Sequence, residues 1–232
     1  MSGVSKRSSG QPVVAIDGPA GAGKSTAAKE LAERLGYVLV DTGALYRGVA
    51  LSAFERGVDW DDGDALGELV QSLSLTFERS EASGLRLMID DIDRTADIRT
   101  PHISTGASRV SRHAPVRRAL LGLQRRLGAK GGVVLEGRDI GTVVFPDAEV
   151  KIFLTASDEA RARRRHAELV RAGHEVDFER VLADIRERDL LDSERDIAPM
   201  RAADDAVVVD TSDTALPVVF DQLETLVKSR MP

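Results

Sequence analysis

Residues 18–25 read Gly-Pro-Ala-Gly-Ala-Gly-Lys-Ser, the pattern of a phosphate-binding loop. Successive N–H groups of such a loop converge on phosphate oxygens, and the positive end of the following helix strengthens the attraction. Lys24 would neutralise the β and γ phosphates of a nucleoside triphosphate, and the Ser25 hydroxyl would take one position around Mg²⁺. The residues expected to bind the triphosphate are Gly18, Pro19, Ala20, Gly21, Ala22, Gly23, Lys24, Ser25 and Thr26.

The segments on either side of this loop supply the structural context that the pattern requires. Residues 13–16 form an apolar run, which predicts a buried strand. Ala27, Ala28, Leu31 and Leu35 follow at helical spacing, and Gly36 is suited to a left-handed residue after the helix. The loop is therefore expected to connect a strand to a helix.

Further apolar runs predict strands at residues 37–40, 133–135, 150–154 and 207–209. Because helical patterns separate the strands, the chain is predicted to be an α/β protein with a parallel five-stranded sheet flanked by helices. Ligands bind outside the carboxyl ends of such strands. The phosphate loop, the turn at 41–47 and the segment Glu136-Gly137-Arg138-Asp139 are all predicted to lie on that edge.

Two regions depart from this alternation. Residues 59–100 are predicted to form a small antiparallel β insertion after one short helix, and residues 101–129 return to a helical pattern. An arginine-rich helix is expected from about residue 157, a break at 173–174 and a further helix from about 177. We interpret residues 161–177 as a helical lid over the site, although the arginines at 161–165 fit a solvated helix face equally well.

Composition limits the classes of protein to consider. There is no cysteine, which excludes disulfides and thiolate metal sites, and the net charge of −6 argues against a general nucleic-acid-binding surface. Residues 1–11 are polar and predict a disordered tail, and residues 12–232 are interpreted as one domain. No apolar run reaches the roughly 20 residues of a membrane span, so a cytoplasmic protein without membrane or nucleic-acid partners is expected.

The phosphate loop alone leaves GTPases, ATPases and kinases open. The sequence lacks the N-K-x-D motif of guanine-specific GTPases, and an arginine follows the strand at 133–135, which indicates a second anionic ligand. Four segments together resemble the bacterial cytidylate kinases, a family of nucleoside monophosphate kinases. These segments are IDGPAGAGKST, DTGALYR, EGRDIGTVVFPDA and the stretch from FERVLADIRERD to SERDIAP.

The resemblance extends from about Val13 onward and implies a P-loop kinase fold, Mg²⁺ with ATP as phosphoryl donor, and CMP or dCMP as acceptor. It places Arg47 and Arg138 at the acceptor phosphate. It places Thr42, Arg117, Asp139 and Arg195 at the cytosine, and Ser108, Arg188 and Asp192 at the sugar. Lys24, Arg138 and Arg188 are the residues expected to be catalytic, Ser25 is the expected metal ligand, and a monomer is expected.

Two alternatives stay open at this stage. Another small-substrate kinase, adenylate kinase first, shares the phosphate loop and the threonine–glycine turn at 42–43, although the EGRD and RERD segments favour cytidylate kinase. A nucleotide-binding module without turnover would use the same loop as a switch. The sequence does not decide between CMP and dCMP.

Overall fold

The computed structural model describes residues 10–80 and 84–231 of the chain. Residues 81–83 of the predicted insertion and most of the predicted N-terminal tail lie outside the described residues. The chain divides into two compact units, which are described separately below. Unit 1 comprises residues 1–38 and 130–232, and unit 2 comprises residues 39–129.

The predicted five-stranded sheet is confirmed. Its strand order is β2-β6-β1-β7-β8, with β1 at Val13–Asp17, β2 at Val38–Asp41, β6 at Val133–Glu136, β7 at Val150–Thr155 and β8 at Val207–Asp210. β1 pairs in parallel with β6 and β7, and β7 pairs in parallel with β8. All five residues of β1 are buried, as expected for a central parallel strand whose two faces are both covered.

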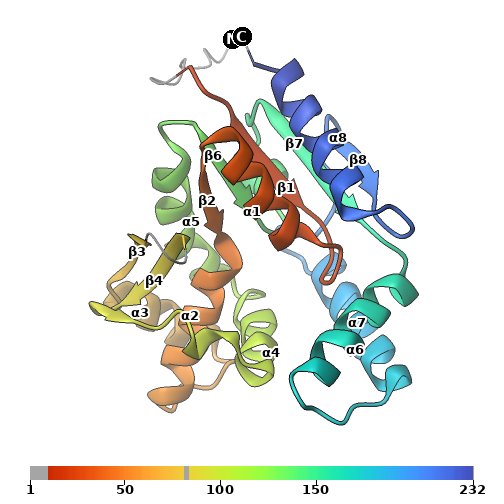
Figure 1. Cartoon of the computed structure of the whole chain (residues 1–232). Coiled ribbons are helices and arrows are strands. Elements are labelled where there is room, and N and C mark those ends of the chain that lie inside the picture. The colour runs from red at the N-terminus through yellow and green to blue at the C-terminus, as the bar shows by residue number, and fades with distance from the viewer. Residues whose placement is uncertain (1–9, 81–83, 232) are drawn as a thin grey trace. The chain divides into compact units, whose positions relative to one another are not determined.

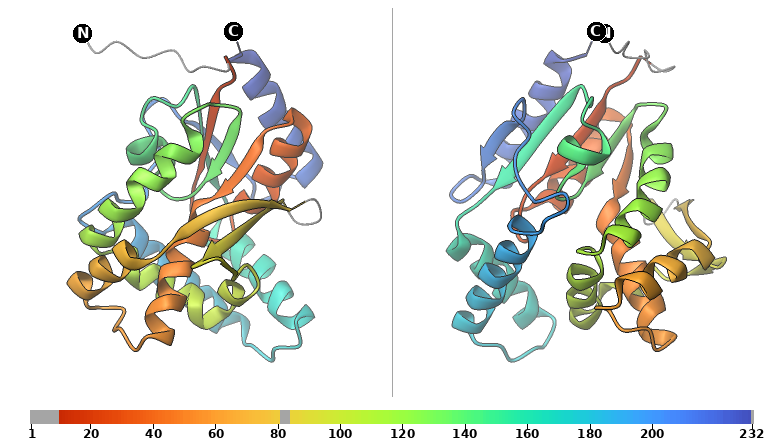
Figure 2. Two further views of the ribbon diagram at one scale, coloured as in Figure 1. Left: turned by 90° about the vertical axis from the view of Figure 1, so that its left-hand side faces the viewer. Right: turned by 180° about the vertical axis from the view of Figure 1, so that it is seen from behind.

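Helices α1 (Lys24–Leu35) and α8 (Leu216–Ser229) lie side by side in unit 1 (Figure 1). The predicted left-handed residue after α1 is confirmed, because Gly36 has a φ of 68° and its N–H caps the helix. Helices α6 (Asp158–Arg171) and α7 (Phe178–Ser193) pack together around a small cluster that contains Val181, Leu182 and Ile185 (Figure 2). They contain the segment predicted to be a lid.

Unit 2 contains the predicted insertion. Helix α3 (Gly63–Ser72) precedes an antiparallel sheet of β3 (Leu75–Ser80), β4 (Gly84–Ile89) and β5 (Ile92–Asp93), as expected for this insertion. The helical stretch predicted over 101–129 is divided into α4 (Pro101–Val110) and α5 (Ala114–Gly128), since residues 111–113 turn the chain. A short 3₁₀ turn, η1 (Asp97–Arg99), joins the insertion to α4.

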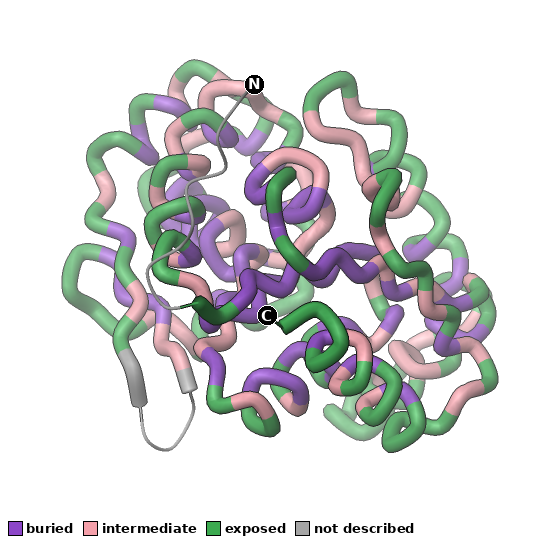
Figure 3. Tube along the Cα trace, turned by 90° about the horizontal axis from the view of Figure 1, so that it is seen from above, coloured by how far each residue is buried: buried purple, intermediate pink, exposed green. Residues whose placement is uncertain are grey.

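One apolar core holds the elements of unit 2 together. Helix α2 (Thr42–Glu55) contributes Leu45 and Val49, and Leu66, Leu87 and Leu120 join them from α3, β4 and α5. Figure 3 shows the buried stretches of the chain in purple and the exposed stretches in green. The core positions of α5 repeat at the spacing of one helix face, as the sequence predicts. Among the described residues, no helix is both long and apolar enough to cross a bilayer.

Candidate active site

The phosphate loop of unit 1 connects β1 to α1, as the sequence predicts. Gly18 has a φ of 141°, and a Cβ atom there would lie 1.9 Å from the Leu154 carbonyl oxygen of β7, so only glycine fits. Gly23 precedes α1 in the left-handed conformation, with a φ of 89°. The loop therefore ends at a helix N-terminus, the arrangement that favours a bound anion.

Lys24 is buried at the start of α1, and its Nζ donates a hydrogen bond to the Pro19 carbonyl at 2.7 Å. Burial and then the nearby Arg138 guanidinium hold the pKa of Lys24 well below its usual value. A phosphate at this place would supply the negative charge that stabilises the ammonium. The site therefore favours an anionic ligand on electrostatic grounds.

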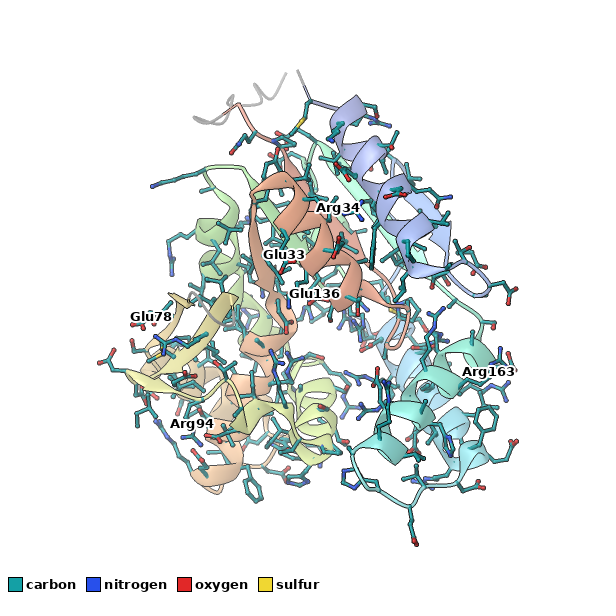
Figure 4. All side chains as sticks on the ribbon, in the orientation of Figure 1. Glu33, Arg34, Glu78, Arg94, Glu136 and Arg163 are labelled. Carbon is teal, nitrogen blue, oxygen red and sulfur yellow. The ribbon has the colours of Figure 1, made fainter. Side chains whose placement is uncertain are left out.

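Ser25 is the expected metal ligand, and the sequence placed the segment that contains Glu136 on the same edge of the sheet but gave Glu136 no role. The Ser25 hydroxyl donates to Glu136 Oε2 at 2.8 Å, and Glu136 is buried at the end of β6, directly beside Ile16 of β1 (Figure 4). Hydroxyl and carboxylate oxygens are the ligand atoms that suit Mg²⁺. The signal in the sequence was a carboxylate at the carboxyl end of a buried strand.

Asp17 is another residue to which the sequence assigned no role. Its buried carboxylate accepts hydrogen bonds from the N–H groups of Ile140 and Gly141 at 2.8 and 2.7 Å. Burial raises the pKa of Asp17 to about 6, although those two hydrogen bonds favour the ionised form. Asp17 thereby ties the end of β1 to the π-helical turn η2 (Ile140–Val144), which directly follows Asp139.

Arginines and carboxylates form a network beside the loop in unit 1. Arg138 Nε donates to Asp192 Oδ2 of α7 at 2.9 Å. Arg195 lies 3.5 Å from Asp139 and 4.0 Å from Asp192, and all three of these side chains are buried. Burial opposes ionisation of Asp192, but Arg138, Arg188 and Arg195 outweigh it and hold the pKa of Asp192 below its usual value.

The structure therefore brings six of the predicted site residues into electrostatic or hydrogen-bonding contact within unit 1. They are Lys24, Arg138, Asp139, Arg188, Asp192 and Arg195. Most of these charges lie on segments at the carboxyl ends of β1 and β6 or on α7. Such a group of buried cations is costly in the absence of carboxylates or a bound anion.

The other predicted acceptor residues lie in unit 2. Arg47 pairs with Asp41 at 2.5 Å, and Asp41 also caps α2 by accepting from the Ala44 N–H at 3.1 Å. Thr42 is buried in the first turn of the same helix. The turn predicted from DTGALYR is thus already helical from Thr42 onward. The helix presents the guanidinium of Arg47, a group that suits phosphate, about one turn after its first residue.

Arg117 and Ser108 are connected through Ser111, also within unit 2. The buried Arg117 donates to the Ser111 carbonyl at 3.2 Å and lies over the ring of Tyr46, with its Cζ 5.5 Å from the ring centroid. The Ser111 hydroxyl donates to the Ser108 carbonyl at 3.0 Å. Two residues that the family resemblance places at the base and the sugar are thus linked through Ser111.

Comparisons with known proteins agree with the resemblance seen in the sequence. A sequence model described as cytidylate kinase matches residues 14–229. A cytidylate kinase of Geobacter sp. strain M21 is 49% identical over 219 residues, which cover 94% of each chain. A cytidylate kinase of Geobacter sulfurreducens is also 49% identical, over 94% of this chain and 93% of its own.

Among solved structures, an uncharacterized protein from Eubacterium ventriosum resembles this chain with a TM-score of 0.53 and 14% identity. The match covers 94% of this chain and 99% of that protein. At this level of identity the likeness shows the fold alone.

Proposed function

The chain belongs to the cytidylate kinase family, and we propose that it transfers the γ-phosphoryl group of ATP to the phosphate of CMP or dCMP. The products are ADP and CDP or dCDP. One structural observation carries the proposal. The phosphate loop follows the carboxyl end of β1, and Arg138 follows the carboxyl end of the neighbouring strand β6. Arg138 is held by Asp192 of α7 in a buried network of charges. A phosphate loop alone explains a donor, whereas the second cationic group explains an acceptor.

We propose that Lys24, Arg138 and Arg188 are the catalytic residues. Charge in phosphoryl transfer spreads over the equatorial oxygens of the transferred group, so fixed cations supply most of the acceleration. Lys24 is held by the Pro19 carbonyl and Arg138 by Asp192, so neither has to reorganise when charge develops. The acceptor phosphate is already an anion, so no general base and no covalent enzyme intermediate are required.

The side chains around Ser25 fit a bound Mg²⁺, since a hydroxyl and a carboxylate lie together there. Ser25 would hold the ion, and Glu136 would orient the Ser25 hydroxyl. The ion, when bound with ATP, neutralises charge on the β and γ phosphates. Water molecules would complete its coordination, because Mg²⁺ usually keeps several.

For the acceptor, we propose that Arg47 and Arg138 hold the phosphate of CMP. Thr42, Arg117, Asp139 and Arg195 would recognise cytosine, and Ser108, Arg188 and Asp192 would contact the sugar. The buried pairs of Arg195 with Asp139 and Asp192 support this assignment, since they fix hydrogen-bonding groups of both signs. We also propose that the enzyme is a monomer and that the predicted lid, residues 161–177, closes over ATP by a movement of its later part, since Arg161 and Arg164 hold its start to the phosphate loop.

A single assay tests the proposal against its alternatives. ADP formation from ATP would be measured with CMP, dCMP, UMP, AMP or shikimate as acceptor, and with no acceptor as the control. We expect the highest kcat/KM with CMP or dCMP, with the diphosphate as product. A preference for AMP would identify an adenylate kinase, and absence of turnover with every acceptor would identify a binding module.

A further inference from the structure

The carbonyl groups of the phosphate loop point to a role for residues outside the motif. In a planar trans peptide, the C=O of one residue and the N–H of the next point in opposite directions, and the described residues contain no cis peptide bond. A loop that turns its N–H groups toward phosphate therefore turns the preceding carbonyls away from it. These carbonyls need partners of their own, because unpaired backbone groups are costly when buried.

Side chains from two distant segments of unit 1 bind three consecutive carbonyls of the loop. Arg161 Nη1 donates to the Ala20 carbonyl at 3.0 Å, and Arg164 Nη1 lies 3.4 Å from the Gly21 carbonyl. The Thr211 hydroxyl donates to the Ala22 carbonyl at 3.1 Å. The arginines come from α6, and Thr211 directly follows β8. The corresponding N–H groups belong to residues 21, 22 and 23.

The single hydroxyl proton of Thr211 has two carbonyls within reach, those of Ala22 and Thr155, each at 3.1 Å. The Thr155 carbonyl already accepts from the Thr211 N–H at 2.8 Å, so donation of the hydroxyl proton to Ala22 gives each of the two carbonyls a donor. Arg164 in turn donates to the Thr211 hydroxyl oxygen at 3.0 Å and to the Thr211 carbonyl. A continuous chain of donors therefore runs from Arg164 through Thr211 to Ala22.

Arg161 is only 3% exposed, and its guanidinium is held on several sides. Nε donates to the Ala156 carbonyl at 3.0 Å, and carboxylates of Asp158 and Asp189 lie at 2.6 and 2.5 Å. A cation that donates to a carbonyl polarises the peptide unit and strengthens its N–H as a donor. The sequence allowed the arginines at 161–165 to belong either to a lid or to a solvated helix face. Neither interpretation predicts that Arg161 and Arg164 donate to carbonyls of the phosphate loop.

We propose that Arg161, Arg164 and Thr211 are positioning residues for the triphosphate. They hold the peptide units between residues 20 and 23 with their N–H groups directed at the phosphates, and the two guanidinium groups polarise those units. The inference rests on the proposed function only for the identity of the ligand, ATP. It predicts that changes at Thr211 alter ATP binding without altering CMP binding.

The substitution Thr211→Val tests the proposal because it removes the hydroxyl and keeps the shape of the side chain. ATP and CMP affinities would be measured by calorimetry, and KM for each substrate by the ADP assay. Loss of one hydrogen bond that leaves a buried carbonyl unpaired predicts about tenfold weaker ATP binding. CMP affinity should change less than twofold, and Thr211→Ser should restore ATP binding.

Two further variants keep the test decisive. Thr225→Val makes the same change on the exposed side of α8 and should leave both affinities unchanged. Arg164→Gln should weaken ATP binding, and its effect should not add to that of Thr211→Val, because both interrupt the same chain of donors. If Thr211→Val does not fold, Arg164→Gln still measures the effect on ATP, because it interrupts the same chain of donors.

Unchanged ATP affinity in Thr211→Val and Arg164→Gln would overturn the proposal. Equal weakening of ATP and CMP together with a lower melting temperature would also overturn it, since that result indicates a merely structural role. Failure of the proposed function would look different. The wild-type protein would then lack turnover with CMP, while the calorimetric comparison of ATP binding would still be valid.

Discussion

The two units of the chain hold their functional side chains in different ways. In unit 1, Lys24, Arg161 and Arg195 are almost completely buried and are held by carbonyls and carboxylates. In unit 2, an apolar core formed by helices and a small sheet supports Arg47, which pairs with one partly exposed carboxylate, Asp41. Fixed charge and fixed packing are thus alternative ways to hold the cations that we propose to bind phosphate. Substitutions that remove one or the other should separate them.

The largest effect is expected at Lys24, where the fixed charge lies closest to the proposed chemistry. Lys24→Met should lower kcat by about 10³-fold, because a preorganised cation is lost from the transferred phosphoryl group. Steady-state ADP formation with CMP would measure it. Lys29→Met on the same helix is the control, since Lys29 is largely exposed, and it should retain activity. Comparable kcat values for the two variants would contradict the role of Lys24.

Arg138→Gln tests whether the buried charges of unit 1 work as a network. It should lower kcat/KM for CMP by about 10²-fold and also destabilise the fold, because it removes a partner of the buried Asp192 carboxylate. Activity and urea unfolding would be measured together. Arg180→Gln on α7, where the Arg180 side chain is 78% exposed, is the control. A loss of stability without any change in kcat/KM would show that the pair is only structural.

Leu120→Ala tests the packing of unit 2. Leu120 is 1% exposed in the apolar core, and its truncation should lower the free energy of unfolding by about 2–5 kcal/mol. Urea unfolding would measure the loss. The exposed Val218→Ala on α8 should cost far less. If the core of unit 2 contributes to folding and not to the ATP site of unit 1, the folded Leu120→Ala protein should keep its KM for ATP. A large change in that KM would contradict this difference between the two units.

Asp17 predicts a pH dependence of stability in unit 1. Its pKa is about 6 in the folded protein against 3.8 for the free side chain, so the folded state binds the proton more tightly. The contribution of Asp17 to stability should therefore be fully present below about pH 4 and be lost as pH rises to about 6, a change of about 3 kcal/mol. The neighbouring charges of Lys24 and Asp139 oppose each other in this shift.

The contribution of Asp17 can be isolated because other groups also titrate in this range. Urea unfolding of the wild type and Asp17→Asn would be compared between pH 4 and 7. The stability of the wild type should fall relative to that of the variant as pH rises to about 6, and the difference should then stay constant. A difference that does not vary with pH would contradict the raised pKa.

The smallest of these effects is expected at Arg47, which lies in unit 2 and is partly exposed. Arg47→Ala should raise KM for CMP about tenfold through loss of one charge-assisted contact and leave KM for ATP within twofold. Arg56→Ala, an exposed position just after α2, is the control. Unchanged KM for CMP would remove Arg47 from the acceptor site.

The phosphate loop could be predicted without a structure, because that site is built from consecutive residues whose backbone does the binding. The five strands were predictable as well, since buried parallel strands appear in the sequence as short apolar runs. The antiparallel insertion was also predictable, because the alternation of apolar strands and helices is interrupted after residue 59. The family resemblance supplied the arginines and carboxylates that unit 1 brings together.

The residues that support the phosphate loop could not be predicted from the sequence, because they lie far from it along the chain. Ser25 and Glu136 are 111 positions apart, Ala20 and Arg161 are 141 apart, and Ala22 and Thr211 are 189 apart. No local pattern marks Thr211, because a threonine after a strand reads as an ordinary turn residue. Parallel strands place residues distant in sequence at one edge of the sheet. The partners of the loop carbonyls are therefore set by the fold.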